Sequence, residues 1–286
     1  MKRVLVLGAQ GMLGHVVRDA FLNNGDDAVG IALEAYDEGI YPLDVATPDF
    51  DRFLNENSFD VIVNCVGVLN EQAEQNPADA IYINAYLPHK LEKLYKNTDT
   101  KIIQPSTDCV FAGNEAPYRE DSAPDGQTYY DRTKALGELR NSKDLTFRMS
   151  IVGPDLNPDG IGLFNWFMKQ KGQIYGYTNA IWTGVATTEL AQGILEGADT
   201  DLTGLYHFVP ESSISKYDIL KLFAEIFNKK DVEIIPKAEP VLDKSLINTR
   251  NDFDYNIPGY KTMFEQMRDY IIQNKNRYPD YYTASL

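Results

Sequence analysis

The first half of the chain alternates short apolar runs with stretches of helical hydrophobic spacing. Arg3–Leu7 is predicted to be a strand buried on both faces, because its apolar residues show no polar alternation. Residues 11–23 carry apolar side chains at helical spacing, and Asn24-Gly25 ends that helix. Similar patterns predict strands at 28–32, 59–63, 101–105 and 145–149, and helices at about 77–96 and 130–140. Alternating strands and helices indicate an α/β fold with a doubly wound parallel sheet.

After Ser150 the pattern changes to a loop-rich segment at 153–160, followed by mixed elements. Apolar spacing predicts helices at 163–171 and 187–197, a strand at 205–209, and a helix that begins at Ser215. We therefore expect a first domain over residues 1–150 and a smaller region over 151–286. Some strands of that second region are expected to return to the main sheet.

Composition excludes several classes of protein. With 286 residues, 43% of them hydrophobic, the chain is long enough for about two domains with a sizeable core. A formal net charge of −15 repels phosphate backbones, so we expect no nucleic-acid partner. No run approaches the ~18 apolar residues of a membrane span, and no cleavage site follows the apolar start. Two cysteines, Cys65 and Cys109, predict no disulfide framework and fit a reduced, cytoplasmic location.

A glycine-rich turn lies between the first predicted strand and the first predicted helix. It reads Gly8-Ala9-Gln10-Gly11-Met12-Leu13-Gly14. Such a turn needs a positive φ, close backbone approach to a pyrophosphate, and close helix packing, and glycine permits all three. The pyrophosphate would lie at the helix N-terminus, where free N–H groups favour an anion. We therefore expect a Rossmann-type dinucleotide-binding domain over 1–150 and mostly substrate-binding residues over 151–286.

The second predicted strand bears on the choice of dinucleotide. An acidic residue at its end would bind the ribose hydroxyls of NAD(H). Here the strand reads Ala28-Val29-Gly30-Ile31-Ala32, and Glu34 comes one or two residues late. No arginine follows closely to hold the extra phosphate of NADP(H). The pattern favours NADP(H) and leaves NAD(H) open.

Reduction of a ketone by a nicotinamide also needs a proton donor. A tyrosine can give the proton, and a lysine one helical turn later lowers the pKa of the phenol. The spacing Tyr-x-x-x-Lys puts both side chains on one helix face. It occurs as Tyr86–Lys90, Tyr130–Lys134 and Tyr217–Lys221. We favour the middle pair, because Pro88 disturbs the first and the third lies far from the first half of the sheet.

Thr107 follows a predicted strand and completes a candidate catalytic group with Tyr130 and Lys134. A hydroxyl at the carboxyl end of a parallel strand lies at the edge of the sheet where ligands bind. It can hold a substrate carbonyl in line for the tyrosine. A lone threonine at a strand end is common, so this interpretation depends on the combination with the pair and the glycine turn.

Four longer segments resemble those of one known family. They are Ser106-Thr107-Asp108-Cys109-Val110-Phe111-Ala112-Gly113, Tyr130-Asp131-Arg132-Thr133-Lys134, Arg148-Met149-Ser150-Ile151-Val152-Gly153 and Leu43-Asp44-Val45. They are similar to segments of the dTDP-4-dehydrorhamnose reductases, in the sugar-nucleotide branch of the extended short-chain dehydrogenase/reductase family. The resemblance covers residues 1 to about 155 well and the remainder patchily. Cys109 and Ile151 stand where typical members carry tyrosine and tryptophan.

The resemblance implies reduction of the 4-keto group of a nucleotide-diphosphate 6-deoxyhexulose, for deoxysugar and cell-surface polysaccharide biosynthesis. It implies that Tyr130 gives the proton, Thr107 aligns the carbonyl and Lys134 grips the nicotinamide ribose. On the cofactor side we expect Gly8, Gln10, Gly11, Met12, Leu13, Gly14, Asp44, Val45, Cys65, Val66, Gly67, Asn84, Ser106, Tyr130 and Lys134. On the substrate side we expect Asp108, Val110 and Trp182, with Lys169 and Arg250 among the cations that offset the acidic surface at a diphosphate.

Two other functions stay open at this point. One is a sugar-nucleotide epimerase that retains NAD, and the other is a non-catalytic regulatory subunit of a methionine adenosyltransferase, since one relative of the family has that role. No metal is expected, because His15, His89 and His207 are scattered and form no ligand spacing. The aromatic tail, Tyr278-Pro279-Asp280-Tyr281-Tyr282, is predicted either to dock on the body or to join subunits, and a homodimer is the oligomer we expect.

Overall fold

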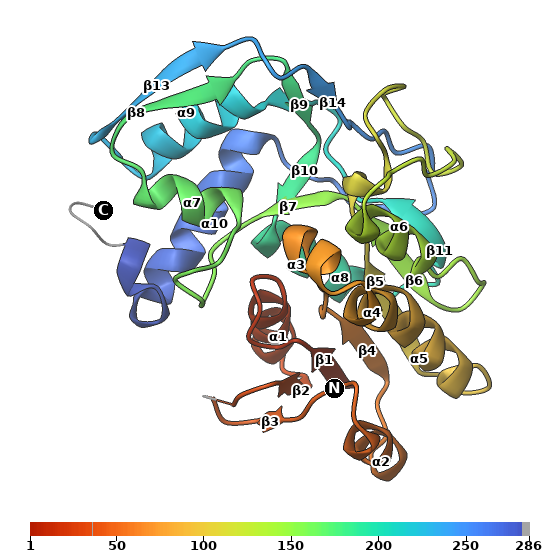
Figure 1. The fold of residues 1–286 in the computed structure, drawn as a ribbon. Helices are drawn as coiled ribbons and strands as arrows, with labels where there is room; N and C mark the ends of the chain where they lie inside the picture. Colours follow the sequence, from red (N-terminus) through yellow and green to blue (C-terminus); the bar gives the residue numbers. More distant parts are fainter. Residues whose placement is uncertain (36, 282–286) are drawn as a thin grey trace.

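The computed structural model describes residues 1–35 and 37–281, and within them a seven-stranded parallel sheet forms the centre of the molecule (Figure 1). Its strands run in the order β11-β6-β5-β4-β1-β2-β3. They are β1 (Arg3–Leu7), β2 (Asp27–Ala32), β3 (Ile40–Pro42), β4 (Val61–Asn64), β5 (Lys101–Pro105), β6 (Leu145–Arg148) and β11 (Gly204–His207). Because β1 pairs with both β2 and β4, the strand order reverses there, and ligands bind at the carboxyl ends of strands beside such a point.

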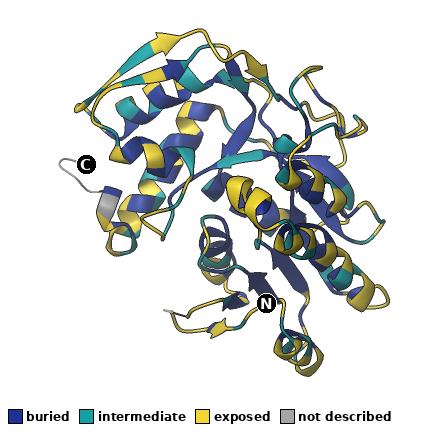
Figure 2. Ribbon diagram, in the orientation of Figure 1, coloured by how far each residue is buried: buried dark blue, intermediate teal, exposed yellow. Residues whose placement is uncertain are grey.

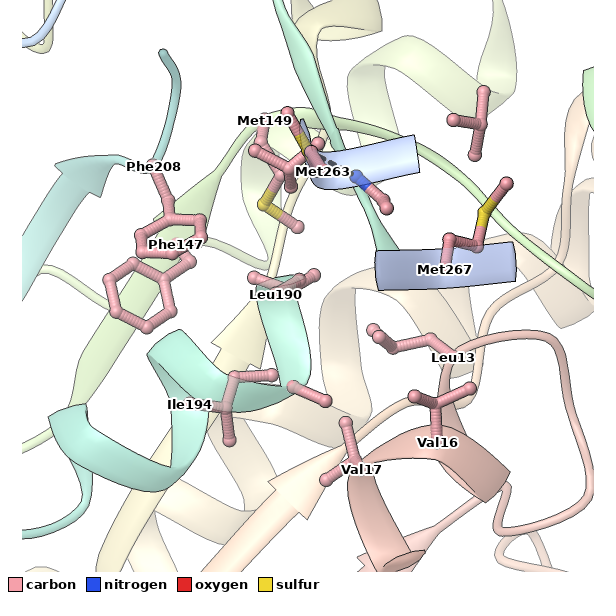
Figure 3. Packing of buried hydrophobic residues seen from close by; sticks show 14 of the residues in the cluster. Leu13, Val16, Val17, Phe147, Met149, Leu190, Ile194, Phe208, Met263 and Met267 are labelled. Carbon is pink, nitrogen blue, oxygen red and sulfur yellow. Dashed lines mark hydrogen bonds between the residues drawn. The ribbon is translucent and has the colours of Figure 1, made fainter. Parts of the chain in front are cut away.

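Helices cover both faces of this sheet, which confirms the predicted fold class. Val4 and Val6 of β1 pack on one face, in a cluster with α1 (Gly14–Asn23), α8 (Thr187–Gly197) and α10 (Tyr260–Gln273) (Figure 3). Leu5 and Leu7 pack on the other face, against α2 (Pro48–Glu56) and α5 (Leu87–Tyr95). Figure 2 shows the strands in the middle of the sheet buried, the edge strand β3 largely exposed, and the outer faces of the helices exposed. An apolar strand without alternation is therefore buried on both sides.

The second half of the chain adds smaller sheets and the helices that pack with them. The strands are β7 (Ser150–Val152), β8 (Gly172–Tyr177), β9 (Ala180–Trp182), β10 (Gly184–Ala186), β12 (Ile214–Ser215), β13 (Val232–Lys237) and β14 (Leu242–Asp243). Helices α7 (Leu163–Lys169), α9 (Lys216–Ile226) and α10 pack with them, and 3₁₀ turns follow at Lys275–Arg277 and Pro279–Tyr281. Strand β11 joins the main sheet beside β6. The domain division at residue 150 stays a prediction. Within the described residues, no helix is both long and apolar enough to cross a membrane.

The helix predicted over 77–96 is divided into three pieces. They are α4 (Pro77–Ala80), a π-helical segment (Ile81–Tyr86) and α5, after the short helix α3 (Asn70–Gln75). Pro88 has no N–H to give the carbonyl of Asn84, and the Leu87 N–H bonds the carbonyl of Tyr82 five residues back. The proline therefore widens the helix locally.

The helix predicted over 130–140 is α6 (Tyr129–Leu136), and it ends where it meets that widened segment. A side chain at Gly137 would place its Cβ 1.9 Å from the Asn84 carbonyl oxygen. The close approach of the two backbones therefore requires glycine and stops the helix there.

Candidate active site

Strand β1 ends in the glycine turn, which folds against β2 and the end of β4. Gly8 has a φ of +74°, and its N–H and that of Ala9 donate to the Ile31 carbonyl at 2.8 and 3.0 Å. A Cβ at Gly14 would lie 2.0 Å from the Gly8 carbonyl oxygen, and one at Gly8 would lie 3.2 Å from the backbone of Cys65. The turn therefore requires glycine at both positions.

Helix α1 begins at Gly14 rather than at residue 11, with Leu13 as its N-cap. In the described part of the chain, no side chain caps this end and no acidic residue lies in its first turn. The N–H groups there suit an anion, so the turn fits the pyrophosphate of a dinucleotide. The Leu13 side chain packs in the core beside Val16 (Figure 3), so contact with a dinucleotide would fall to its backbone. Gln10 and Met12 are partly exposed.

Asn84 holds the loop that follows β4, which includes the predicted cofactor residues Cys65, Val66 and Gly67. Its amide group exchanges two hydrogen bonds with the backbone of Val68, at 2.8 and 2.9 Å, and donates to the Thr133 hydroxyl at 3.1 Å. Asn84 is 1% exposed. In the structure Asn84 ties the loop after β4 to α6, and its contact with the cofactor stays a prediction.

Three other predicted cofactor residues, Ser106, Val45 and Asp44, have the following surroundings in the structure. The Ser106 hydroxyl donates to the Glu138 carboxylate at 2.8 Å, so it faces the protein interior rather than a dinucleotide. Val45 is buried, which leaves its backbone for ligand contact. Asp44 is exposed after β3 and accepts the Ala46 N–H at 2.8 Å, and its contact with the cofactor stays a prediction.

Thr107 and Tyr130 meet at the carboxyl end of β5. Thr107 caps the 3₁₀ turn Asp108–Val110, where its hydroxyl oxygen accepts the Cys109 N–H at 3.1 Å. Tyr130 is the second residue of α6, whose N-cap Thr128 forms a capping box with the third helical residue. The Thr107 hydroxyl, which also donates to Asp108 at 3.3 Å, lies close enough to the Tyr130 phenol to act on its pKa. The capped helix start thus holds the phenol at the end of the strand.

Lys134 reaches the same strand end from one helical turn later. Its ammonium donates to the Pro105 carbonyl at 2.8 Å, and the residue is 8% exposed. Burial lowers the pKa of Lys134 to about 8, although Glu138 and Cys65 act in the opposite direction. The structure therefore brings the three predicted catalytic side chains together, and their roles stay predictions.

The electrostatics of Tyr130 differ from the sequence-based expectation that Lys134 lowers its pKa. Burial, followed by the neighbouring Cys109 and Asp108, raises the pKa of Tyr130, while the hydrogen bond from Thr107 opposes the rise. The Lys134 ammonium is directed at Pro105 instead. A neutral phenol can give a proton, so this direction suits a general acid.

The other two Tyr-x-x-x-Lys pairs lie elsewhere. The Lys90 ammonium pairs with Asp51 of α2 at 2.5 Å, and Tyr86 is exposed. The Lys221 ammonium lies 5.4 Å from the centre of the Tyr217 ring, over its face. Of the three pairs, we therefore keep Tyr130–Lys134, which lies at the carboxyl end of β5, as the candidate.

Asp108 is the predicted substrate residue that lies beside Thr107. It is 6% exposed, and burial raises its pKa while the charges of Lys216 and Lys244 oppose the rise. The Lys216 ammonium lies 4.9 Å from the centre of the Trp182 ring. Sequence reasoning missed Lys216, because it begins α9, far along the chain from every motif.

Three predicted substrate residues lie in the core or have protein partners elsewhere. Val110 is fully buried, and Trp182 is 2% exposed with its ring 5.8 Å from that of Tyr260, so both side chains belong to the core. The Arg250 guanidinium donates to the carbonyls of Thr203 and Leu205 at 2.7 and 2.8 Å. Those carbonyls flank the amino end of β11, at the opposite edge of the sheet from the active site.

Lys169 lies at the end of α7 and its ammonium bonds the Pro158 carbonyl. It therefore ties the loop at 153–160 to α7, and its contact with substrate stays a prediction.

Behind the active site lies a buried ion pair that the motifs alone do not indicate. The Arg148 Nε and Nη2 atoms donate to the two Glu138 oxygens at 2.7 and 2.6 Å, and both side chains are at most 1% exposed. Glu138 follows α6, and Ser106, which donates to it, precedes Thr107. The pair therefore links the strand end that carries Thr107 to the helix that carries Tyr130.

Comparisons with known proteins identify the family. A family model described as RmlD substrate binding domain matches residues 1–245. The chain is 26% identical over 255 residues to the dTDP-4-dehydrorhamnose reductase of Aggregatibacter actinomycetemcomitans, covering 84% of this chain and 85% of that one. It is 31% identical over 269 residues to methionine adenosyltransferase 2 subunit beta of Pongo abelii, covering 84% and 77%.

A solved structure shares the fold. The dTDP-4-dehydrorhamnose reductase of Bacillus anthracis in complex with NADP has a TM-score of 0.80 and 21% identity, and the match covers 94% of this chain and 99% of that one. The family model spans most of the chain, and its reach includes the glycine turn, Thr107, Tyr130 and Lys134. The chain therefore belongs to the RmlD substrate binding domain family, that of the dTDP-4-dehydrorhamnose reductases.

Proposed function

We propose that the protein is an NAD(P)H-dependent oxidoreductase that reduces the 4-keto group of a nucleotide-diphosphate 6-deoxyhexulose. The observation that carries the proposal is the meeting of Thr107, Tyr130 and Lys134 at the end of β5. The uncapped start of α1 supports a dinucleotide partner. The Aggregatibacter and Bacillus relatives, both named for dTDP-4-dehydrorhamnose, support the substrate class.

In this proposal the bound nicotinamide supplies a hydride to C4. The Thr107 hydroxyl orients the substrate carbonyl, and the buried, neutral phenol of Tyr130 gives its proton to the carbonyl oxygen. Lys134 holds the nicotinamide ribose from the next helical turn. NADP(H) is the favoured dinucleotide, supported by the NADP complex of the Bacillus relative, and NAD(H) is the alternative. A role in polysaccharide biosynthesis, a cytoplasmic location and a homodimer also stay predictions.

The test is a screen of NADPH and NADH consumption with dTDP-, UDP-, GDP- and CDP-linked 4-keto sugars. We expect oxidation with at least one of them, and a turnover at least ~10²-fold lower for Tyr130→Phe because the general acid is lost. Tyr217→Phe is the matched control, since it removes a phenol from another Tyr-x-x-x-Lys pair, and its turnover should equal the wild type. A loss of turnover in Tyr217→Phe instead would overturn the assignment.

A second candidate function is a regulatory subunit, favoured by the 31% identity to methionine adenosyltransferase 2 subunit beta. No nicotinamide oxidation with any substrate, together with stimulation of a methionine adenosyltransferase, would support it against the reductase. Purified protein that retains NAD and consumes no added NADPH would instead support an epimerase.

A further inference from the structure

The aromatic segment after α10 contacts the first turn of α1, beside the glycine turn, and no step above uses it. Tyr278 is 1% exposed, and its hydroxyl lies 2.6 Å from the Nε2 atom of His15 in α1. The other ring nitrogen of His15, Nδ1, lies 2.7 Å from the Gly11 carbonyl oxygen. A chain of two hydrogen bonds therefore joins the C-terminal segment to the middle of the turn.

The direction of these hydrogen bonds follows from the groups involved. The Gly11 carbonyl can only accept, so His15 carries its proton on Nδ1 and presents Nε2 as an acceptor. Tyr278 therefore donates its hydroxyl proton to Nε2. Burial lowers the pKa of His15 to about 4, so the ring is neutral near pH 7 and this tautomer persists.

The same segment is anchored on α1 at Asp19. The Arg277 guanidinium pairs with the Asp19 carboxylate at 2.6 Å, and the Tyr270 hydroxyl donates to the same oxygen at 2.5 Å. These contacts fix the position of Tyr278 relative to the helix. The Tyr278 hydroxyl is therefore held in a fixed position beside His15.

A second phenol holds the loop that lies on the other side of the turn. The Tyr281 hydroxyl accepts the Asp155 N–H at 2.8 Å and contacts the Asn165 side-chain oxygen at 3.2 Å. That loop ends at Gly162, where an added Cβ would lie 3.0 Å from the sulfur of Met12. Figure 1 shows the loop before α7 descending between the end of α10 and α1. The C-terminal segment thus reaches the turn through His15 and contacts the loop directly.

Two hydrogen bonds hold the Gly11 carbonyl, one from the His15 side chain at 2.7 Å and one from the His15 backbone N–H at 3.2 Å, and together they set the direction of one N–H group. A trans peptide is planar, so its carbonyl and the following N–H point in opposite directions. Because the Gly11 carbonyl points to His15, the Met12 N–H points away from α1 and out of the turn. We propose that His15 and Tyr278 are positioning residues that hold the Met12 N–H toward the pyrophosphate of the dinucleotide. This inference rests on the proposed function only in that it requires a bound dinucleotide, and it does not depend on the sugar substrate.

The test measures NADPH and ADP-ribose binding by titration, without any sugar substrate. His15→Leu removes both side-chain hydrogen bonds, to Gly11 and to Tyr278, and leaves only the weaker backbone bond to Gly11, so we expect at least tenfold weaker binding of both ligands. Tyr278→Phe removes only the support of His15, and we expect a three- to tenfold loss. The double variant should bind within twofold of His15→Leu, because the two residues act in one chain.

The matched control is Tyr260→Phe. Tyr260 is a buried tyrosine of α10 whose hydroxyl donates to the Ser212 carbonyl at 2.8 Å, away from the glycine turn. Both phenylalanine variants should lower the unfolding midpoint, and only Tyr278→Phe should weaken ligand binding. Unchanged binding in Tyr278→Phe with a lowered midpoint would refute the positioning role alone. A wild-type chain that binds neither NADPH, NADH nor ADP-ribose would refute the cofactor of the proposed function as well.

Discussion

Replacing Arg148 by methionine removes a buried charge behind the active site and keeps an unbranched side chain. The guanidinium is fully buried, bonds both oxygens of Glu138 and lies 4.9 Å from the centre of the Phe111 ring. Methionine leaves the Glu138 carboxylate, 1% exposed, without its main partner. An unpaired charge in that position destabilises the fold far more than loss of a surface ion pair.

The size of the effect follows from the remaining partners. Removal of one member of a buried ion pair costs about 3–5 kcal/mol. Arg140, 2.9 Å from Glu138 and half exposed, and the Ser106 hydroxyl still contact the carboxylate, so we expect the lower end, about 3 kcal/mol. With an unfolding entropy of about 2.1 cal/mol/K per residue, 286 residues give about 0.6 kcal/mol/K, so the unfolding midpoint should fall by about 5 °C.

The same ion pair gives the loss a pH dependence. Burial opposes ionisation of Glu138, but the hydrogen bonds and charge of Arg148 outweigh it and lower the pKa of the carboxyl group. The stability that such a group adds is fully present above its ordinary pKa of about 4.3 and is lost as the pH falls through the lowered value. The stability difference between wild type and Arg148→Met should therefore be full at pH 7 and shrink below about pH 4.

Urea unfolding, followed by circular dichroism at pH 7 and at about pH 3.5, measures both effects. The matched control is Arg140→Met, which removes the half-exposed partner of the same carboxylate and should cost less than about 1 kcal/mol. Equal stabilities of the two variants would refute the assignment of the buried pair. A difference that stays constant down to pH 3.5 would refute the role of the Glu138 charge.

The remaining predictions concern the turn and Lys134. Gly14→Ala places a Cβ 2.0 Å from the Gly8 carbonyl oxygen, so the affinity for NADPH should fall at least ~100-fold. Circular dichroism should still show a folded chain. Near-normal affinity by titration would contradict the turn geometry. Because the pKa of Lys134 is about 8, kcat/KM should fall as the pH rises through that value and the ammonium is lost. Lys134→Arg should move that decline upward by at least one pH unit, and an unmoved decline would assign it to another group.

Local patterns were sufficient to predict the sheet and the side chains that meet at the end of β5. The strands are continuous apolar runs because both of their faces are covered, and Gly8 and Gly14 are required by contacts within one turn. Tyr130 and Lys134 are neighbours on one helix, so their spacing alone places them together. Thr107 could be added because the carboxyl ends of parallel strands share one edge.

The substrate side could not be predicted in the same way, since residue type does not fix a side chain's partners. Arg250 was chosen for its charge, and its guanidinium instead satisfies two backbone carbonyls at the amino end of β11. Trp182 was chosen as an aromatic residue of the substrate region, and it packs in the core. Lys216 carries no motif, and only the packing of α9 brings its charge near Asp108.

Helix α6 owes its position to contacts that lie outside the catalytic motif. Asn84 bonds Thr133 within the helix, and Glu138 just after it bonds both Arg148 and the residue before Thr107. The Tyr-x-x-x-Lys spacing fixes Tyr130 relative to Lys134, but it does not fix either residue relative to Thr107. The distance from α6 to Thr107 depends on the Arg148–Glu138 ion pair and on the side-chain amide of Asn84. A chain that kept the spacing and lost Arg148 or Asn84 would therefore retain the motif without its geometry, so these supports are better evidence for a working reductase than the motif alone.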